Sequence, residues 1–188
     1  MNKQYITAQQ LLTDAFALAW QVFDSGCRPS CIVGIWRGGA PVGIAVHELM
    51  HVLGVEADHI ALRTRSYTGI GQRDERIQVD GLDYLIANLG RNDTLLLVDD
   101  VHDTGLSLQQ ITTDLRQALG AECPDIRIAT PYFKPGNNRV GHNPDYFLHQ
   151  TDDWLVFPHE LAGLSLEEMR ANKPELAALL PQIASNMR

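Results

Sequence analysis

One apolar run, which ends in acids and a helix start, constrains the fold of this chain more than any other feature. The run covers Thr94–Val98, and its leucines and valine predict a buried strand. Asp99, Asp100 and Asp103 follow it, and the Thr-Gly-x-Ser pattern of Thr104–Ser107 predicts a helix start. A buried strand that leads into a helix is typical of right-handed βαβ units and a parallel sheet. Because ligands of such sheets bind at the carboxyl ends of strands, this segment is a candidate site.

The remaining hydrophobic pattern alternates strands and helices in the same way. Short apolar runs predict further strands at Cys31–Trp36, His59–Arg63, Ile126–Phe133 and Tyr146–His149. Helical spacing predicts helices at Thr7–Gly26, Pro41–Gly54, Thr104–Leu119 and Glu167–Ile183, the last interrupted near Pro174. The polar stretch Ser66–Asp80 predicts a long loop or a loose hairpin. We therefore expect one α/β domain with a mainly parallel sheet flanked by helices, which suits a length of 188 residues.

Composition excludes several classes of function. The chain has 15 Lys and Arg against 23 Asp and Glu, a formal charge of -8, which repels polyphosphate and predicts no nucleic-acid partner. The three cysteines are odd in number and indicate no disulfide framework, which favours a cytoplasmic location. No segment has the length and apolar character of a membrane span or a secretory signal, so we expect no membrane partner.

The segment after Val98 offers two kinds of chemistry side by side. Backbone N–H groups and hydroxyls of Thr104–Ser107 at a helix N-terminus suit a phosphate, and Gly105 allows a close approach. Asp99 and Asp100 suit ribose hydroxyls or a hydrated Mg²⁺. The alternative is a strand that ends in solvated acids before an ordinary helix cap. A nucleotide hydrolase would need a G-x-x-x-x-G-K-[ST] loop, which this sequence lacks.

Other strand ends carry further candidate groups. Arg37 with Gly38 and Gly39 presents a guanidinium and free N–H groups to an anion, although diglycines are common in βα turns. Lys134 follows a strand, and its ammonium could donate to a ring carbonyl while Trp154 stacks on the ring. The alternative for these two residues is a surface lysine and a core tryptophan.

His47–His51 matches the H-E-x-x-H pattern of zinc peptidases. Two histidines four residues apart share a helix face and could bind zinc with Glu48 as the base. The extended pattern needs a third histidine where Ala57 stands. We therefore favour histidines on a solvated or subunit-facing side of a helix over a metal site.

The run after Val98 resembles the signature for 5-phosphoribosyl diphosphate (PRPP) of type I phosphoribosyltransferases. The resemblance implies that Asp99 and Asp100 hold the ribose hydroxyls and the metal-bound side of PRPP. It also implies a 5′-phosphate site made of Asp103, Thr104, Gly105, Leu106 and Ser107, and a pyrophosphate site made of Trp36, Arg37, Gly38, Gly39 and Arg63. A cis peptide would join Trp36 to Arg37. Ser66 and Tyr67 would belong to a flexible loop that closes over PRPP and excludes water.

The segment from Val140 to Glu160 resembles the C-terminal part of 6-oxopurine phosphoribosyltransferases. The resemblance implies that Lys134 recognises the purine O6, that Trp154 stacks on the base, and that Leu155 offers backbone groups to its edge. Glu160 would help to hold Mg²⁺ together with Asp99 and Asp100. We expect a core at about residues 25–135, and a small hood that binds the base at about 136–188.

The activity implied by this resemblance is transfer of the phosphoribosyl group from PRPP to a 6-oxopurine (hypoxanthine, xanthine or guanine) in purine salvage. Asp103 would lie near the purine N7, as a base or as a counter-charge to the ribosyl cation. Two alternatives remain open: a regulator that senses PRPP or a nucleotide on the same fold, and a transferase for another nucleobase. We also expect a homo-oligomer, either a dimer or a tetramer.

Overall fold

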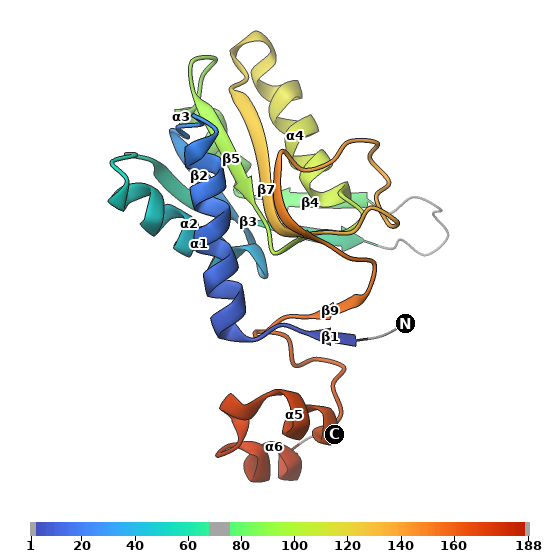
Figure 1. Ribbon diagram of the computed structural model, residues 1–188. Helices are drawn as coiled ribbons and strands as arrows, with labels where there is room; N and C mark the ends of the chain where they lie inside the picture. Colours follow the sequence, from blue (N-terminus) through green and yellow to red (C-terminus); the bar gives the residue numbers. More distant parts are fainter. Residues whose placement is uncertain (1–2, 68–75, 187–188) are drawn as a thin grey trace. The chain divides into compact units, whose positions relative to one another are not determined.

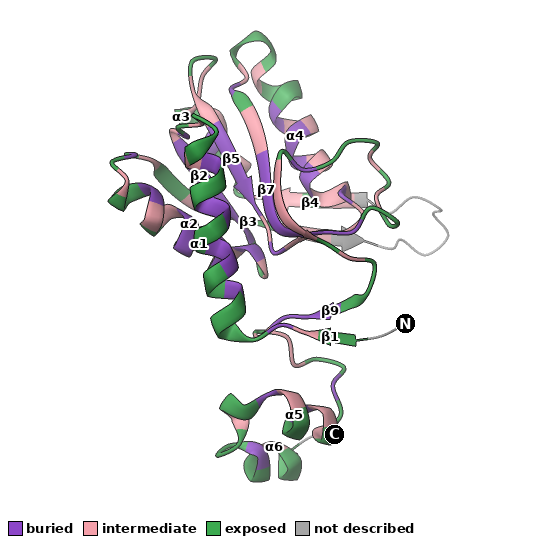
Figure 2. Cartoon of the chain, viewed as in Figure 1, coloured by how far each residue is buried: buried purple, intermediate pink, exposed green. Residues whose placement is uncertain are grey.

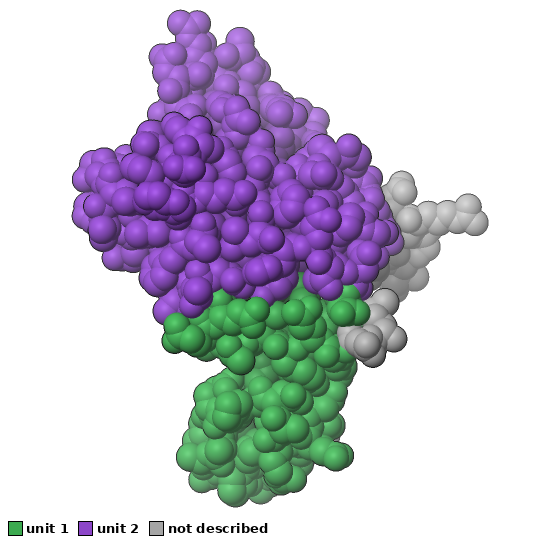
Figure 3. Space-filling model, viewed as in Figure 1, with its two compact units in different colours: residues 1–11, 153–188 green, residues 12–152 purple. Residues whose placement is uncertain are grey.

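The structure is a computed structural model that describes residues 3–67 and 76–186 (Figure 1). Separate hydrophobic clusters of buried residues occur within these ranges (Figure 2). The chain divides into two compact units, a larger unit of residues 12–152 and a smaller unit of residues 1–11 and 153–188 (Figure 3). No helix in the described ranges is long and apolar enough to cross a membrane.

The larger unit is built on a seven-stranded sheet in the order β4-β3-β2-β5-β7-β6, with β8 also paired to β7. Its strands are β2 (Cys31–Trp36), β3 (Asp58–Tyr67), β4 (Arg76–Asp80), β5 (Thr94–Val98), β6 (Val101–His102), β7 (Asp125–Phe133) and β8 (Tyr146–Gln150). The strand pairs are parallel apart from β3 with β4, which is antiparallel. The predicted α/β class with a mainly parallel sheet is confirmed.

Helices connect these strands in the alternating order that the sequence predicts. They are α1 (Ala8–Asp24), α2 (Gly39–Val52), α3 (Leu82–Asn88) and α4 (Leu106–Leu119), with a 3-10 turn at Gly120–Glu122. Thr7 Oγ1 accepts a hydrogen bond of 3.1 Å from the Gln10 N–H, as the predicted cap of α1 requires. The short α3 follows Gly81 and was not predicted. The stretch 66–80, expected as a loop or loose hairpin, includes the antiparallel β3–β4 pair, and the hairpin tip lies outside the described residues.

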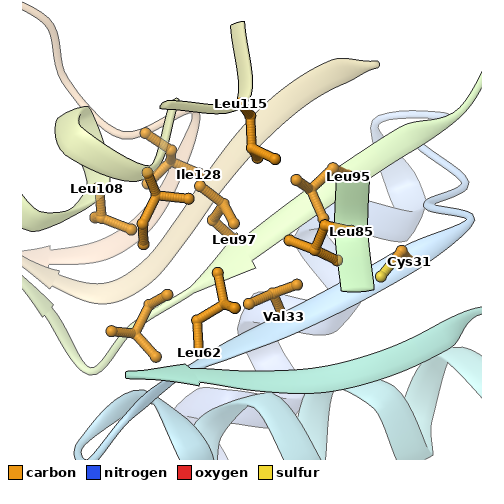
Figure 4. Packing of buried hydrophobic residues seen from close by; sticks show 11 residues of the cluster. Cys31, Val33, Leu62, Leu85, Leu95, Leu97, Leu108, Leu115 and Ile128 are labelled. Atoms are coloured by element: carbon orange, nitrogen blue, oxygen red, sulfur yellow. The ribbon is translucent and has the colours of Figure 1, made fainter. Parts of the chain in front are cut away.

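One hydrophobic cluster of the larger unit lies between the sheet and helices α3 and α4, and buried residues of α1 and α2, including Leu18 and Val46, belong to the rest of the core. Alternate residues of β2 and β5, including Val33 and Leu97, point to this side, as side chains in a strand must. They pack against Leu108 and Leu115 of α4 and Leu85 of α3 (Figure 4). Both central strands are almost fully buried, and the polar side chains of Arg37 and Asp99 follow directly after their carboxyl ends.

The smaller unit combines the two ends of the chain. Its strands β1 (Lys3–Tyr5) and β9 (Trp154–Val156) pair in parallel, and helices α5 (Leu166–Asn172) and α6 (Leu180–Asn186) flank a 3-10 turn at Pro174–Leu176. Val156, Leu164, Met169 and Leu180 form its own hydrophobic cluster. The interruption predicted near Pro174 is confirmed, whereas β1 and β9 are too short to have shown an alternating pattern.

Candidate functional site

The acid pair and the glycine turn leave the sheet on adjacent strands. In the β2–β5 register Gly34 lies opposite Val98, so the turn after Trp36 and the acids after Val98 emerge at the same edge. A Cβ atom at Gly38 would lie 1.8 Å from Asp100 Oδ2. A Cβ at Gly39 would lie 2.4 Å from the Val98 carbonyl oxygen. Only glycine permits this approach, and the turn therefore presents its backbone directly beside the carboxylates.

The peptide bond between Trp36 and Arg37 is cis, as the resemblance implied. Trp36 is paired in register with Arg63 of the neighbouring β3, so both arginines lie at the same edge of the sheet as the glycine turn. Arg37 and Arg63 are exposed, and neither forms an ion pair with another residue of the described ranges. Two guanidinium groups at the end of the sheet make this edge suitable for an anion.

Asp99 is the most perturbed acid of this edge. Its carboxylate accepts hydrogen bonds from the backbone N–H of Asp100, at 3.0 Å, and of Gly39. Burial, and secondarily the negative charge of Asp100, raises the pKa of Asp99 well above its usual range. A cation or a pair of hydroxyl donors placed here would relieve that unfavourable charge.

The donor set of this edge fits Mg²⁺, because carboxylate oxygens are the ligands that this hard cation prefers. The described residues contain no group of three or more His, Cys, Asp or Glu side chains arranged to hold an ion. Asp99 and Asp100 therefore fit a Mg²⁺ that takes its other ligands from water and from the phosphate oxygens of a substrate.

A cavity of about 100 Å³ lies at the N-terminus of α4, lined by Asp99 and residues 101–108. Gly105 adopts φ +76°, and a Cβ there would lie 2.6 Å from the ring of His102 and from a methyl group of Val140. Glycine is therefore required at this turn for its conformation and for space. The cavity combines backbone N–H groups at a helix start with Thr104 and Ser107, a combination that suits a phosphate.

Asp103 and Lys134, predicted from separate motifs, form an ion pair in the larger unit. Lys134 Nζ lies 3.3 Å from Asp103 Oδ2, and its side chain is only 10% exposed. The pairing of β6 with β7 brings the two together, since His102 is in register with Phe133, the residue before Lys134. Asn137 donates from Nδ2 to Asp103 Oδ1 at 2.8 Å. The Asp103 carboxylate is thus held from both sides beside the phosphate-suited cavity.

His102 is fully buried next to this pair. Neither of its ring nitrogens has a hydrogen-bond partner among the described residues, and its ring packs edge-on against Phe133. Burial, and secondarily the charge of His142, lowers the pKa of His102. The neutral ring of His102 therefore packs against Gly105.

Comparison with known proteins accounts for this arrangement. The family described as the phosphoribosyl transferase domain matches residues 1–164. The chain belongs to the phosphoribosyltransferase family. Xanthine-guanine phosphoribosyltransferase from Ruegeria sp. (strain TM1040) is 29% identical over 178 residues, covering 88% of this chain and 90% of that protein.

Other members of the phosphoribosyltransferase family are similar over comparable lengths. Hypoxanthine-guanine phosphoribosyltransferase from Staphylococcus aureus (strain Mu50 / ATCC 700699) is 24% identical, covering 85% of this chain and 82% of the relative. The crystal structure of a purine phosphoribosyltransferase from Pyrococcus horikoshii Ot3 superimposes with a TM-score of 0.66 at 27% identity, covering 88% of this chain and 98% of that one. The phosphoribosyltransferase fold expected from the sequence is thereby confirmed.

The remaining predicted residues of this phosphoribosyltransferase belong to the smaller unit or to the end of β3. Trp154 is 56% exposed and Leu155 is buried, both in β9 of the smaller unit, whereas Lys134 belongs to the larger unit. Glu160, predicted as a Mg²⁺ ligand, accepts a hydrogen bond of 3.0 Å from the Phe157 N–H through Oε2. Ser66 and Tyr67 end β3, and their side chains lie outside the described part of the chain. The roles of these residues stay predictions.

The H-E-x-x-H histidines lie on α2. His47 Nε2 lies 3.2 Å from the Ala57 carbonyl oxygen, and its ring contacts that of His59. His51 is exposed and lies 3.6 Å from Glu56. The contacts recorded for the two histidines are thus to different partners.

Sequence reasoning missed Asn137. The Lys-Pro-Gly-Asn sequence that follows β7 predicts a turn, but nothing in it marks Asn137 as a partner of an acid. Its partner Asp103 could not be identified without the strand pairing.

Proposed function

We propose that this protein transfers the phosphoribosyl group of PRPP to a 6-oxopurine base in purine salvage, releasing a nucleoside 5′-monophosphate and pyrophosphate. The observation that carries the proposal is the buried Lys134 ammonium 3.3 Å from Asp103, beside the cavity at the start of α4. Asp103, which can interact with the base nitrogens, and Lys134, which can donate to a ring carbonyl, are thus hydrogen-bonded to each other beside the loop that suits a phosphate. The relatives, which are xanthine-guanine and hypoxanthine-guanine phosphoribosyltransferases, support the same base class.

The groups of the larger unit divide the reaction between them. In the proposed mechanism Arg37, Arg63 and the Gly38–Gly39 backbone hold the departing pyrophosphate. Asp99 and Asp100 orient the ribose hydroxyls and hold Mg²⁺, which when bound supplies positive charge against the leaving group. Residues 103–107 hold the 5′-phosphate. This division follows the positions of the groups on the sheet, because the glycine turn with Arg37 comes after β2 and the acids come after the neighbouring β5.

Asp103 is the proposed catalytic residue. Its carboxylate would accept a proton at the purine N7 or oppose positive charge on the ribose as the C1′–O bond lengthens. Its bonds to Lys134 and Asn137 fix its orientation before the base arrives.

Recognition of the base is assigned to Lys134, Trp154 and Leu155. An ammonium has three donors and no acceptor, so Lys134 pairs with a carbonyl at C6 and opposes the amino group of adenine. The exposed face of Trp154 is available for stacking on a purine. The backbone of Leu155 would then meet the edge of the ring.

Several finer assignments belong to the same proposal. Glu160 adds a carboxylate to the Mg²⁺ set, and Ser66 and Tyr67 close over bound PRPP. The active form is a homo-oligomer, a dimer or a tetramer, in the cytoplasm, where the three free cysteines stay reduced. The chain acts as one phosphoribosyltransferase domain whose hood extends from about residue 136.

The test is a spectrophotometric assay with PRPP, Mg²⁺ and each of hypoxanthine, guanine, xanthine and adenine. We compare wild type with Lys134→Met, and use Arg91→Met as a control because Arg91 is an exposed cation in the turn before β5. A hydrogen bond to a charged group is worth about 1.5–3 kcal/mol, so Lys134→Met should lower kcat/KM for 6-oxopurines by roughly 10- to 150-fold. Robust use of adenine by wild type would overturn the base assignment. Tight PRPP binding with no turnover on any base would favour a regulator instead.

A further inference from the structure

The last helices of the chain lie outside the family match and still hold the strand that carries Trp154. The match ends at residue 164, whereas α5, the 3-10 turn and α6 occupy residues 166–186. Within the smaller unit, two charged side chains of this C-terminal extension make hydrogen bonds beside the small sheet: Lys173 contacts Phe157, which directly follows β9, and Glu168 contacts β1. Neither residue has a part in the proposed reaction.

Lys173 is a lysine whose charge is buried. Only 2% of the residue is exposed, and Nζ donates to the Phe157 carbonyl oxygen at 2.6 Å. Burial is the main reason that its pKa is lowered, and the charges of Glu175 and Glu160 oppose the shift. A buried charge adds little net stability compared with a well-packed apolar side chain. The carbonyl oxygen of Phe157 is the acceptor that satisfies this buried ammonium.

Phe157 receives contacts from both sides of its backbone. Its N–H donates to Glu160 Oε2 at 3.0 Å, and its carbonyl oxygen accepts from the Glu160 N–H, at 3.0 Å, as well as from Lys173. Phe157 directly follows β9, three residues after Trp154. Fixing this peptide therefore limits how far the backbone of Trp154 and Leu155 can shift.

Glu168 ties the same extension to β1. Its Oε1 accepts from Lys3 and, at 3.1 Å, from the Tyr5 hydroxyl, while Oε2 accepts from the Ser165 N–H at 2.8 Å in a capping box. The hydrogen bond from Lys3 is the main reason that the pKa of Glu168 is lowered to about 2. Lys3 and Tyr5 are paired in register with Trp154 and Val156. The extension thus holds both strands of the small sheet.

We propose that Lys173 is a positioning residue for the purine base, which acts by fixing the Phe157 peptide and through it the backbone of Trp154 and Leu155. The proposal rests on the proposed function, because it assigns base recognition to these two residues. The proposed function assigns Lys173 no contact with the base or with PRPP. Its loss therefore alters the affinity for the base and leaves PRPP binding and the chemical step unchanged.

The experiment compares Lys173→Met with Arg170→Met. Methionine keeps the length of the lysine stem and removes the ammonium, and Arg170 is an exposed cation of α5, the helix that Lys173 directly follows. Glu168→Gln is the second variant, because glutamine preserves the capping box and Glu168 is partly exposed. For each protein we measure kcat, KM for guanine, KM for PRPP and the thermal midpoint. Hydrogen–deuterium exchange of peptides covering residues 154–161 reports on the backbone independently of activity.

Lys173→Met should raise KM for guanine roughly tenfold, the lower end of the effect of losing a hydrogen bond to a charged group. The kcat and KM for PRPP should stay within about twofold of wild type, and exchange at 154–161 should accelerate. Glu168→Gln should raise KM for guanine by about threefold, as for a partly exposed ion pair, and Arg170→Met should change nothing.

A Lys173→Met protein that keeps its KM for guanine overturns the positioning role, and so does one in which KM for PRPP and kcat change in parallel. If Lys173→Met does not fold, the decision passes to Glu168→Gln, and an unchanged KM for guanine there overturns the proposal. A wild type that transfers nothing to any purine refutes the proposed function, and the positioning role falls with it. An active wild type with unaffected variants refutes only the positioning role.

Discussion

Replacing Gly39 by alanine tests whether contact between the glycine turn and β5 builds the PRPP site. The new Cβ would lie 2.4 Å from the Val98 carbonyl oxygen and 2.8 Å from Asp99 Cα. The first atom belongs to the backbone of the buried β5 and the second to the residue that directly follows it, so neither can rotate away. Restoring an ordinary contact of about 3.4–4 Å requires the turn to move by roughly 1.0–1.6 Å. Gly38→Ala differs, because the atoms nearest to its Cβ belong to the Asp100 side chain, which can rotate.

The displacement sets the size of the expected effects. Overpacking of this kind costs about 1–3 kcal/mol, which lowers the thermal midpoint of a chain of this length by roughly 2–12 °C. A misplacement of about 1 Å in a reacting group can reduce activity by about 10²-fold, and we expect that loss in kcat/KM for PRPP. Gly38→Ala should lose comparable activity with a smaller change in midpoint, because its neighbour is a functional carboxylate and not backbone.

The assay is steady-state kinetics with PRPP varied at saturating guanine, together with thermal unfolding by circular dichroism. Gly90→Ala is the matched control, since its added Cβ would meet nothing closer than 4.0 Å, at Asp93 Oδ2. An unchanged KM for PRPP in a folded Gly39→Ala protein would refute the assignment of this turn to the pyrophosphate. An unchanged midpoint would refute the packing argument.

Three further outcomes follow from the acids at the sheet edge. Asp103→Asn should lower kcat by roughly 10²–10⁴-fold while PRPP binding, measured by calorimetry, is retained; normal turnover would remove Asp103 from the mechanism. Asp99→Asn should raise the thermal midpoint at neutral pH, because the raised pKa of Asp99 means that the folded state binds its proton more tightly than the unfolded state. Wild type therefore loses stability as the pH rises from the pKa of Asp99 in the unfolded chain through its raised pKa in the folded protein. Thermal midpoints measured between pH 4 and 8 should show the advantage of Asp99→Asn at neutral pH and its disappearance toward pH 4. Chelation should abolish activity and added Mg²⁺ should restore it, whereas a requirement for zinc that disappears in His47→Ala would revive the H-E-x-x-H hypothesis.

Much of the fold was predictable because its signals are local. The strands Cys31–Trp36 and Thr94–Val98 agree with the prediction at both ends, since continuous apolar runs bounded by glycine or acids leave little freedom in their limits. The three-residue β1 and β9 were not predictable. Strands of that length exist only because each pairs with a partner about 150 positions away in the sequence.

The candidate site, like the fold, was predictable from the sequence only in part. The motifs identified the acids after Val98 and the glycine turn, because a phosphate loop needs particular residues in an unbroken sequence. The partners of Asp103 were not identified. Asn137 and Lys134 reach it through the β6–β7 pairing, and no periodicity in the sequence specifies which strands become neighbours.

The sequence by itself determined which chemical groups stand at the carboxyl ends of the buried strands, because hydrophobic runs and turn residues act over a few neighbouring positions. Tertiary structure alone decided the distances between those groups. The clash that a side chain at Gly38 would make with Asp100, and the burial of Lys173 against Phe157, arise from contacts between segments distant in the chain. Such contacts form only when the whole core is packed, because folding is cooperative. The free energy that holds each contact in place comes from the burial of many residues together.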